Sequence, residues 1–131
     1  RILDKLGMSA DEIATVCSAI GNHDESTAFP VNAVAAALIL ADKTDVRRTR
    51  VRNRDKASFD IHDRVNYAVE KAATTLNAQE KAVVLTLTLD TEITAVMDYF
   101  EIFLDRMMLC RKAAEKLGLS FRLVVNGQAV M

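Results

Sequence analysis

Hydrophobic residues recur at helical spacing along the first part of the chain. Residues 1–6 resemble the end of a helix, with Gly7 just past that end. Ser9 and Glu12 have the spacing of a capping box, which predicts a second helix that begins after Ser9 and ends at Gly21. The apolar face of this helix is expected to consist of Ile13, Val16, Cys17 and Ile20.

Another helix is predicted after the polar loop of residues 22–29. Pro30 suits its first turn, because the backbone N–H groups of a first turn have no partner inside the helix and proline has none to lose. The helix is expected to continue to Lys43. Its apolar stripe is expected to consist of Val34, Ala37, Leu38 and Ala41.

Alternation with a period of two replaces the helical spacing after Phe59. Val65, Tyr67 and Val69 alternate with polar or small residues, although a helix competes for residues 62–74. In residues 83–89, leucine and valine alternate with threonine, and residues 77–81 supply a turn between the two segments. These patterns together predict a β-hairpin.

A long amphipathic helix and a last strand complete the pattern. Thr91 is the predicted N-cap of the helix, Gly118 ends it, and residues 121–125 form the strand. Because a helix between two strands returns the chain for a parallel crossover, the last strand should run in the same direction as residues 83–89. We expect it beside the first strand, antiparallel to it. The predicted class is therefore α+β, with a helical part over residues 1–58 and a ββαβ subdomain over residues 59–131.

Composition narrows the class of protein. Half of the 131 residues are hydrophobic and the net charge is −1, which argues against disorder and against a general attraction to nucleic acid or acidic membranes. No apolar run is long enough to span a bilayer. Cys17 and Cys110 lie in apolar helical patterns and are expected to be buried free thiols in a reducing cytoplasm.

Arginines crowd the segment that joins the two predicted parts. They are Arg47, Arg48, Arg50, Arg52 and Arg54. Alternate arginines would share one side of an extended segment, which suits a phosphate or nucleotide groove or a nucleic acid. The same side suits salt bridges to a later acidic cluster, and we favour this reading slightly. The acidic residues are Asp60, Asp63, Asp90 and Asp98. Since no aromatic residue lies among the arginines, nucleic acid is not the expected partner.

Two short motifs bring imidazole and carboxylate groups to the ends of the two predicted helices. Ile20 and His23 form the pattern I-x-x-H, and Ala41 and Asp42 begin the pattern A-D-K-x-D. Clusters of histidine and carboxylate are what hard or borderline divalent cations prefer. Taken alone, His23 is more simply an exposed loop histidine, and Asp42 is nearly as well explained by a salt bridge to a nearby arginine.

In this order the motifs resemble the distal half of an HD-domain metal-dependent phosphohydrolase, over residues 13–48. The resemblance implies that Asp42 is a ligand of a divalent ion such as Mn, Mg or Fe, and that His23 binds a second metal or the substrate. We expect Lys43, Arg47 and Arg48 to bind phosphate. The first histidine and the His-Asp pair of that family have no counterpart in residues 1–22, and the pairs at 23–24 and 62–63 do not follow the apolar helical run of the family.

The activity implied by the resemblance is hydrolysis of a nucleotide or another small phosphate ester by a metal-activated water. Because a lone aspartate and histidine rarely fix a divalent ion, we expect the chain to be a fragment of such an enzyme, inactive by itself. The alternative is a non-catalytic regulatory or dimerisation module built on a degenerate HD fold. The helix over residues 91–117 has a broad apolar stripe and, with the sheet, offers a surface for a homodimer.

Overall fold

The computed structural model of the chain describes residues 1–24, 27–53 and 55–131. Arg54 of the arginine-rich segment lies outside the described residues. The helices are α1 (Ile2–Lys5), α2 (Ala10–Gly21), α3 (Ala33–Lys43), η1 (Arg48–Arg50), η2 (Lys56–Ser58), α4 (Ile61–Ala68) and α5 (Val96–Lys116). The strands are β1 (Val69–Asn77), β2 (Ala82–Leu89), β3 (Ser120–Val125) and β4 (Gln128–Ala129). The predicted α+β class is confirmed.

The four strands form one mixed sheet in the order β1-β2-β3-β4. β1 is antiparallel to β2, and β2 is parallel to β3, as the crossover through α5 predicted. The predicted position of β3 beside β1 is wrong, because β3 lies on the other side of β2. The hydrophobicity of the strands explains this order: β2, whose Leu85 and Leu87 are fully buried, lies inside the sheet, while the largely exposed β1 forms an edge.

The hairpin begins later than the alternation predicted. Residues 61–68 form helix α4, so the strand predicted for Val65 and Tyr67 is wrong. Asp60 caps this helix, and its side chain accepts a hydrogen bond of 2.7 Å from the Asp63 N–H. Val65 and Ala68 are three residues apart and both fully buried. This spacing fits the helix that was the alternative to a strand in this segment.

The long helix α5 also begins later than predicted. Its first residue is Val96 and its N-cap is Ala95, so the assignment of Thr91 as the cap is wrong. The chain first makes a turn in which the Thr94 N–H donates to the Asp90 carbonyl, at 3.3 Å. Gly118, with φ of +73°, follows the end of the helix as predicted.

Helix α2 has the predicted extent, α3 begins later than predicted, and neither buries the face that was predicted. The capping box of Ser9 and Glu12 is present, whereas α3 begins at Ala33 behind an Asn32 cap, so Pro30 precedes its first turn. The buried side of α3 contains none of the four residues of the predicted stripe and lies two positions away from it, on the other side of the helix. It consists of Ala35, Ala36, Ile39, Leu40 and Lys43. Because α3 carries apolar residues on every side, its periodicity could not select the face that packs against α5.

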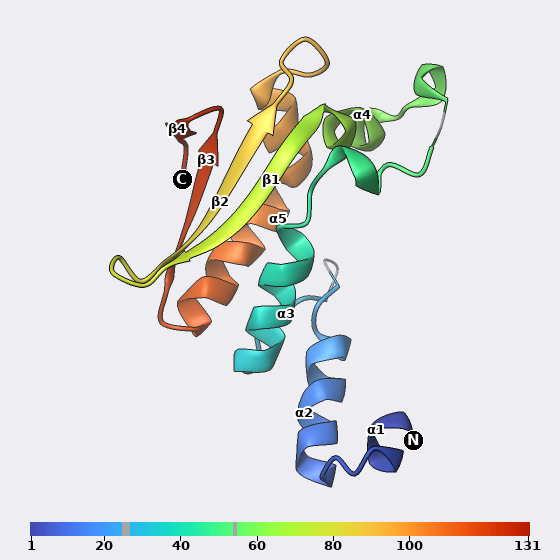
Figure 1. Cartoon of the computed structure of the whole chain (residues 1–131), viewed down its shortest axis with the longest axis vertical. Coiled ribbons are helices and arrows are strands. Elements are labelled where there is room, and N and C mark those ends of the chain that lie inside the picture. Colours follow the sequence, from blue (N-terminus) through green and yellow to red (C-terminus); the bar gives the residue numbers. More distant parts are fainter. Residues whose placement is uncertain (25–26, 54) are drawn as a thin grey trace.

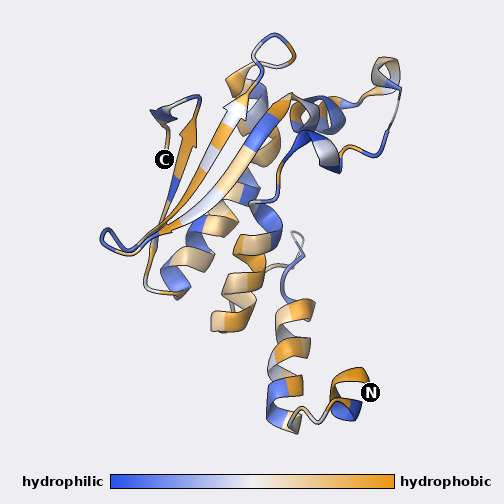
Figure 2. Cartoon of the chain, in the orientation of Figure 1, coloured by the Kyte–Doolittle hydropathy of each residue, from blue (hydrophilic) through white to orange (hydrophobic). Residues whose placement is uncertain are grey.

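Helix α2 contributes little to the core. Ala19 is its one buried residue, Ile20 is 56% exposed, and Cys17 is exposed, so the expectation of a buried Cys17 is wrong. Cys110 on α5 is buried as expected. In Figure 1, α1 and α2 extend away from the sheet and the other helices, and Figure 2 shows hydrophobic residues along both.

The core lies where α3 and α5 pack against one face of the sheet (Figure 1). Its largest fully buried side chains are Tyr99, Ile39, Leu85, Leu87, Met107 and Leu123. Residues from both sides of the predicted boundary after residue 58 belong to this cluster, and the division into residues 1–58 and 59–131 stays a prediction.

Candidate functional site

His23 lies just beyond the end of α2, where a hydrogen bond fixes its ring. Its Nδ1 atom is 2.6 Å from the carbonyl oxygen of Ile20, one turn back along the helix. A carbonyl oxygen can only accept, so Nδ1 carries a proton, and in the neutral form of the ring Nε2 has a lone pair. Metal-binding histidines have the same arrangement, because their second N–H donates to a carbonyl or carboxylate. The half-buried His23 therefore presents Nε2 as a potential ligand.

Asp42 lies in the last turn of α3 and is held by its neighbour. The Nζ atom of Lys43 donates to Asp42 Oδ2 at 2.6 Å. The side chain of Lys43 is 7% exposed and that of Asp42 is 35% exposed. A buried ammonium group needs a negative partner, so this contact both neutralises Lys43 and orients the carboxylate.

The pKa of Asp42 reveals which other groups lie near its carboxyl. Burial by itself raises this pKa, but the hydrogen bond and charge of Lys43, together with the charges of His23 and Arg106, outweigh burial. The pKa of Asp42 therefore lies below its ordinary value, and the carboxylate is ionised at neutral pH. The end of α2, the end of α3 and the middle of α5 thus bring one carboxylate and three basic side chains together.

Arg106 is the member of this group that the sequence interpretation missed. It lies on α5, and its guanidinium carbon is 4.7 Å from the centre of the Phe103 ring. Its charge also acts on buried Cys110, one turn further along α5. The signal in the sequence is a cation between Phe103 and Met107, two residues of the buried face, where a charge needs a partner.

Cys110 lies close to this cluster but is not a nucleophile. Burial raises the pKa of its thiol to about 12, and the opposing charges of Arg106 and Lys43 do not restore the ordinary value. The thiolate is the reactive form of cysteine, so Cys110 remains an inert protonated thiol at neutral pH. The chemistry of the cluster therefore belongs to His23, Asp42 and the cations.

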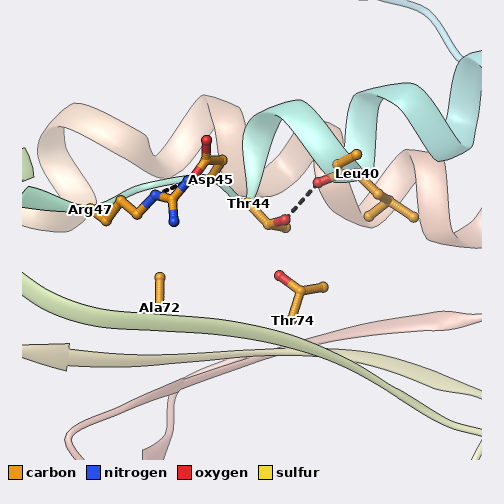
Figure 3. A pocket seen from close by; sticks show the side chains of 7 residues that line it. Leu40, Thr44, Asp45, Arg47, Ala72 and Thr74 are labelled. Carbon is orange, nitrogen blue, oxygen red and sulfur yellow. Dashed lines mark hydrogen bonds and ion pairs between the residues drawn. The ribbon is translucent and has the colours of Figure 1, made fainter. Parts of the chain in front are cut away.

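Arg47, expected to bind phosphate, instead pairs with Asp45. Its Nε atom is 2.8 Å from Asp45 Oδ1, and Arg50 contacts the other oxygen at 3.1 Å. The pair lies beside a cavity of about 510 Å³ between the end of α3 and strand β1 (Figure 3). The cavity is lined by Leu40, Ala41, Thr44, Asp45, Arg47, Ala72 and Thr74.

Arg48 points to a different part of the molecule. Its Nε atom donates to the Tyr67 carbonyl at 2.7 Å, its guanidinium carbon is 4.5 Å from the centre of the Tyr67 ring, and its Nη2 atom is 4.0 Å from Asp90 Oδ2. Because residues 48–50 form a 3₁₀ turn, the expected extended segment with alternate arginines on one side is wrong here. Arg48 joins η1 to α4 through Tyr67, and its contact with Asp90 is a salt bridge of the kind that the sequence predicted.

Of the expected site residues, the structure groups His23, Asp42 and Lys43, and directs Arg47 and Arg48 to other partners. Among residues 1–24, 27–53 and 55–131, no three histidine, cysteine, aspartate or glutamate side chains cluster closely enough to hold a metal ion.

Comparison with protein-family models, with curated proteins and with solved structures finds no match. The resemblance therefore rests on the two sequence motifs alone.

Proposed function

We propose that the chain is part of a metal-dependent phosphohydrolase that cleaves the phosphoester bond of a nucleotide or another small phosphate ester. Asp42 and His23 supply two ligands for a divalent ion such as Mn, Mg or Fe. The observation that carries the proposal is that the two motifs converge, since His23 lies near enough to lower the pKa of Asp42. The imidazole of His23 and the ionised, partly exposed carboxylate of Asp42 are suitable ligands for such an ion, but two ligands are too few to hold it.

The surrounding cations support a phosphate as the second occupant. Lys43 and Arg106 act on the Asp42 carboxylate, and ammonium and guanidinium groups are the side chains that bind phosphate oxygens in proteins. Lys43 also orients Asp42 through their hydrogen bond, as residues behind metal ligands commonly do. A divalent ion held by Asp42 and His23 would polarise a phosphoryl oxygen and lower the pKa of a bound water.

Binding of Mn²⁺ tests the ligand assignment. Asp42→Asn removes the negative charge with almost no change in shape, and we expect it to weaken Mn²⁺ binding at least about tenfold in a calorimetric titration. Asp11→Asn is the matched control, because Asp11 is an exposed carboxylate in the first turn of α2, at the end opposite His23. Equal affinities for the two variants would show that Asp42 is not a ligand.

We also propose that the chain forms a homodimer. Two exposed apolar regions support this association: Met97 and Leu104 on α5 are 74% and 46% exposed, and Leu76 on strand β1 is 65% exposed. A second copy that covers either region would remove large apolar side chains from water.

We assign the protein to the cytoplasm and expect no nucleic acid as its partner. Both cysteines are free thiols, which suits a reducing compartment, and the net charge is −1. Within the described residues, no helix is both long and apolar enough to cross a membrane.

A further inference from the structure

Strand β1 leaves one backbone edge without a strand partner. Within the described residues it pairs with β2 on one side and with no strand on the other. Proteins commonly protect such edges with charged residues, prolines or bulges, because an open edge can pair with another chain. From Ala72 to Asn77 the edge has neither charge nor proline.

A bulge limits the regular part of this edge. Val69 pairs with Leu89 and Lys71 pairs with Thr88, so the register shifts at Glu70. From Lys71 to Asn77 the pairing with β2 is regular. The open regular edge therefore covers residues 71–77, and its central residue is Thr74.

We propose that this edge pairs antiparallel with the same edge of a second copy, around a two-fold axis at Thr74. The inference rests on the proposed homodimer and places its interface at the sheet rather than on α5. Antiparallel pairing of identical strands is naturally two-fold symmetric, so one surface serves both copies. The two sheets then form one continuous sheet across the dimer.

The register set by the bulge brings compatible side chains together. With Thr74 opposite its own copy, Ala72 faces the second Leu76 and Lys71 faces the second Asn77, so no like charges are opposed. Residues opposite each other point to the same face of a sheet, so each Leu76 is placed beside Ala72 on the face that carries the helices.

The cavity beside β1 accepts this leucine. It is about 510 Å³ in volume, and its lining includes Ala72 together with Leu40 and Ala41 of α3. Figure 3 shows the side chains of Ala72 and Thr74 on the face of β1 that points toward α3. Pairing of the two edges therefore buries the exposed Leu76 and fills an apolar part of the cavity.

The opposite edge of the sheet favours a closed dimer over a fibre. β4 at that edge has two residues, and the Val130 N–H donates back to Leu123 at 2.9 Å. A strand this short offers little backbone to another chain. Association through β1 thus ends at two copies.

Sedimentation equilibrium of the whole chain over a concentration series tests the interface. Thr74→Lys places two like charges opposite each other at the axis, and we expect it to raise the dimer dissociation constant at least about tenfold. Thr86→Lys is the matched control: it adds the same charge at an exposed position of the inner strand β2, and the dimer should persist. Circular dichroism establishes that both variants are folded.

Disulfide formation tests the register. In a Cys17→Ser background, Thr74→Cys should cross-link two copies under oxidation, because opposite residues of an antiparallel pair bring their Cβ atoms within disulfide reach. Thr75→Cys is the control and should cross-link poorly, since Thr75 lies diagonal to its copy in this register.

A dimer that resists Thr74→Lys but dissociates with Met97→Glu would contradict the edge interface without contradicting the homodimer. A wild-type chain that is monomeric at every concentration overturns both.

Discussion

The carboxylate of Asp42 has a cation from its own helix in contact and two more basic groups nearby. Burial raises the pKa of this carboxyl, and among the groups that lower it Lys43 has the greatest effect, because the two side chains touch at 2.6 Å and Lys43 is buried. The His23 and Arg106 groups come from other elements and add to the same effect on the pKa of Asp42. The fold thus lowers the pKa of Asp42 below its ordinary value and holds the ionised carboxylate next to Lys43.

This arrangement predicts how stability depends on pH. Because the pKa of Asp42 is lower in the folded chain than its ordinary value of 3.8, the ionised carboxylate stabilises the fold above that value. The contribution is lost as the pH falls through the lowered pKa. Asp42→Asn should therefore reduce the free energy of unfolding by about 1 kcal/mol at neutral pH, a small value because solvent screens a partly exposed carboxylate.

Urea unfolding at neutral pH and through the acid range measures this difference. It should shrink toward zero in acid, while Asp11→Asn should show no comparable loss at neutral pH. A penalty for Asp42→Asn that is the same at every pH would indicate a packing defect rather than a lost charge.

Single residues also show what sequence could and could not predict of the site. His23 and Asp42 could be named because each follows a recognisable helical segment in a fixed motif. Arg106 could not be joined to them, because 64 positions of sequence separate it from Asp42 and the packing of α3 on α5 creates their proximity. Arg47 and Arg48 were grouped by sequence, yet the 3₁₀ turn sends their side chains to different partners.

Among the elements, the start of α2 and the end of α5 were predicted well, whereas Thr91 was wrongly assigned as the cap of α5. The capping box of α2 and Gly118 after α5 act locally, so the sequence reveals them. The buried face of α3 and the choice of helix for residues 61–68 depend on tertiary contacts. A helix with apolar residues on all sides does not indicate which side its neighbours will cover.

The elements also differ in how firmly the fold holds them. α1 has no buried residue and α2 has Ala19, whereas α5 has seven. We therefore expect the amides of α2 to exchange hydrogen through local opening at a lower free energy than those of α5 or β2. Native-state hydrogen exchange followed residue by residue measures this, and equal protection in α2 and α5 would contradict it.

At the scale of the whole molecule, the helices and the sheet have separate tasks. The ends of α2 and α3 and the middle of α5 assemble the His23–Asp42 cluster on the helical side. The sheet packs against α5, and within the described residues the outer edge of β1 has no strand partner. The strand order was predicted wrongly although the sequence contains a signal for it, because β2 is more hydrophobic than β1 and lies inside the sheet. The proposed metal chemistry and the proposed pairing thus use different surfaces.

The central claim is that His23 and Asp42 hold a divalent ion, and pulsed electron paramagnetic resonance of added Mn²⁺ tests it most directly. Bound Mn²⁺ should show the nitrogen modulation of a coordinated imidazole. The chain has two histidines, so His23→Gln should abolish that modulation, while His62→Gln, at an exposed position of α4, should leave it unchanged. Bound Mn²⁺ without a nitrogen signal, or a signal that survives in His23→Gln, would contradict the proposed site.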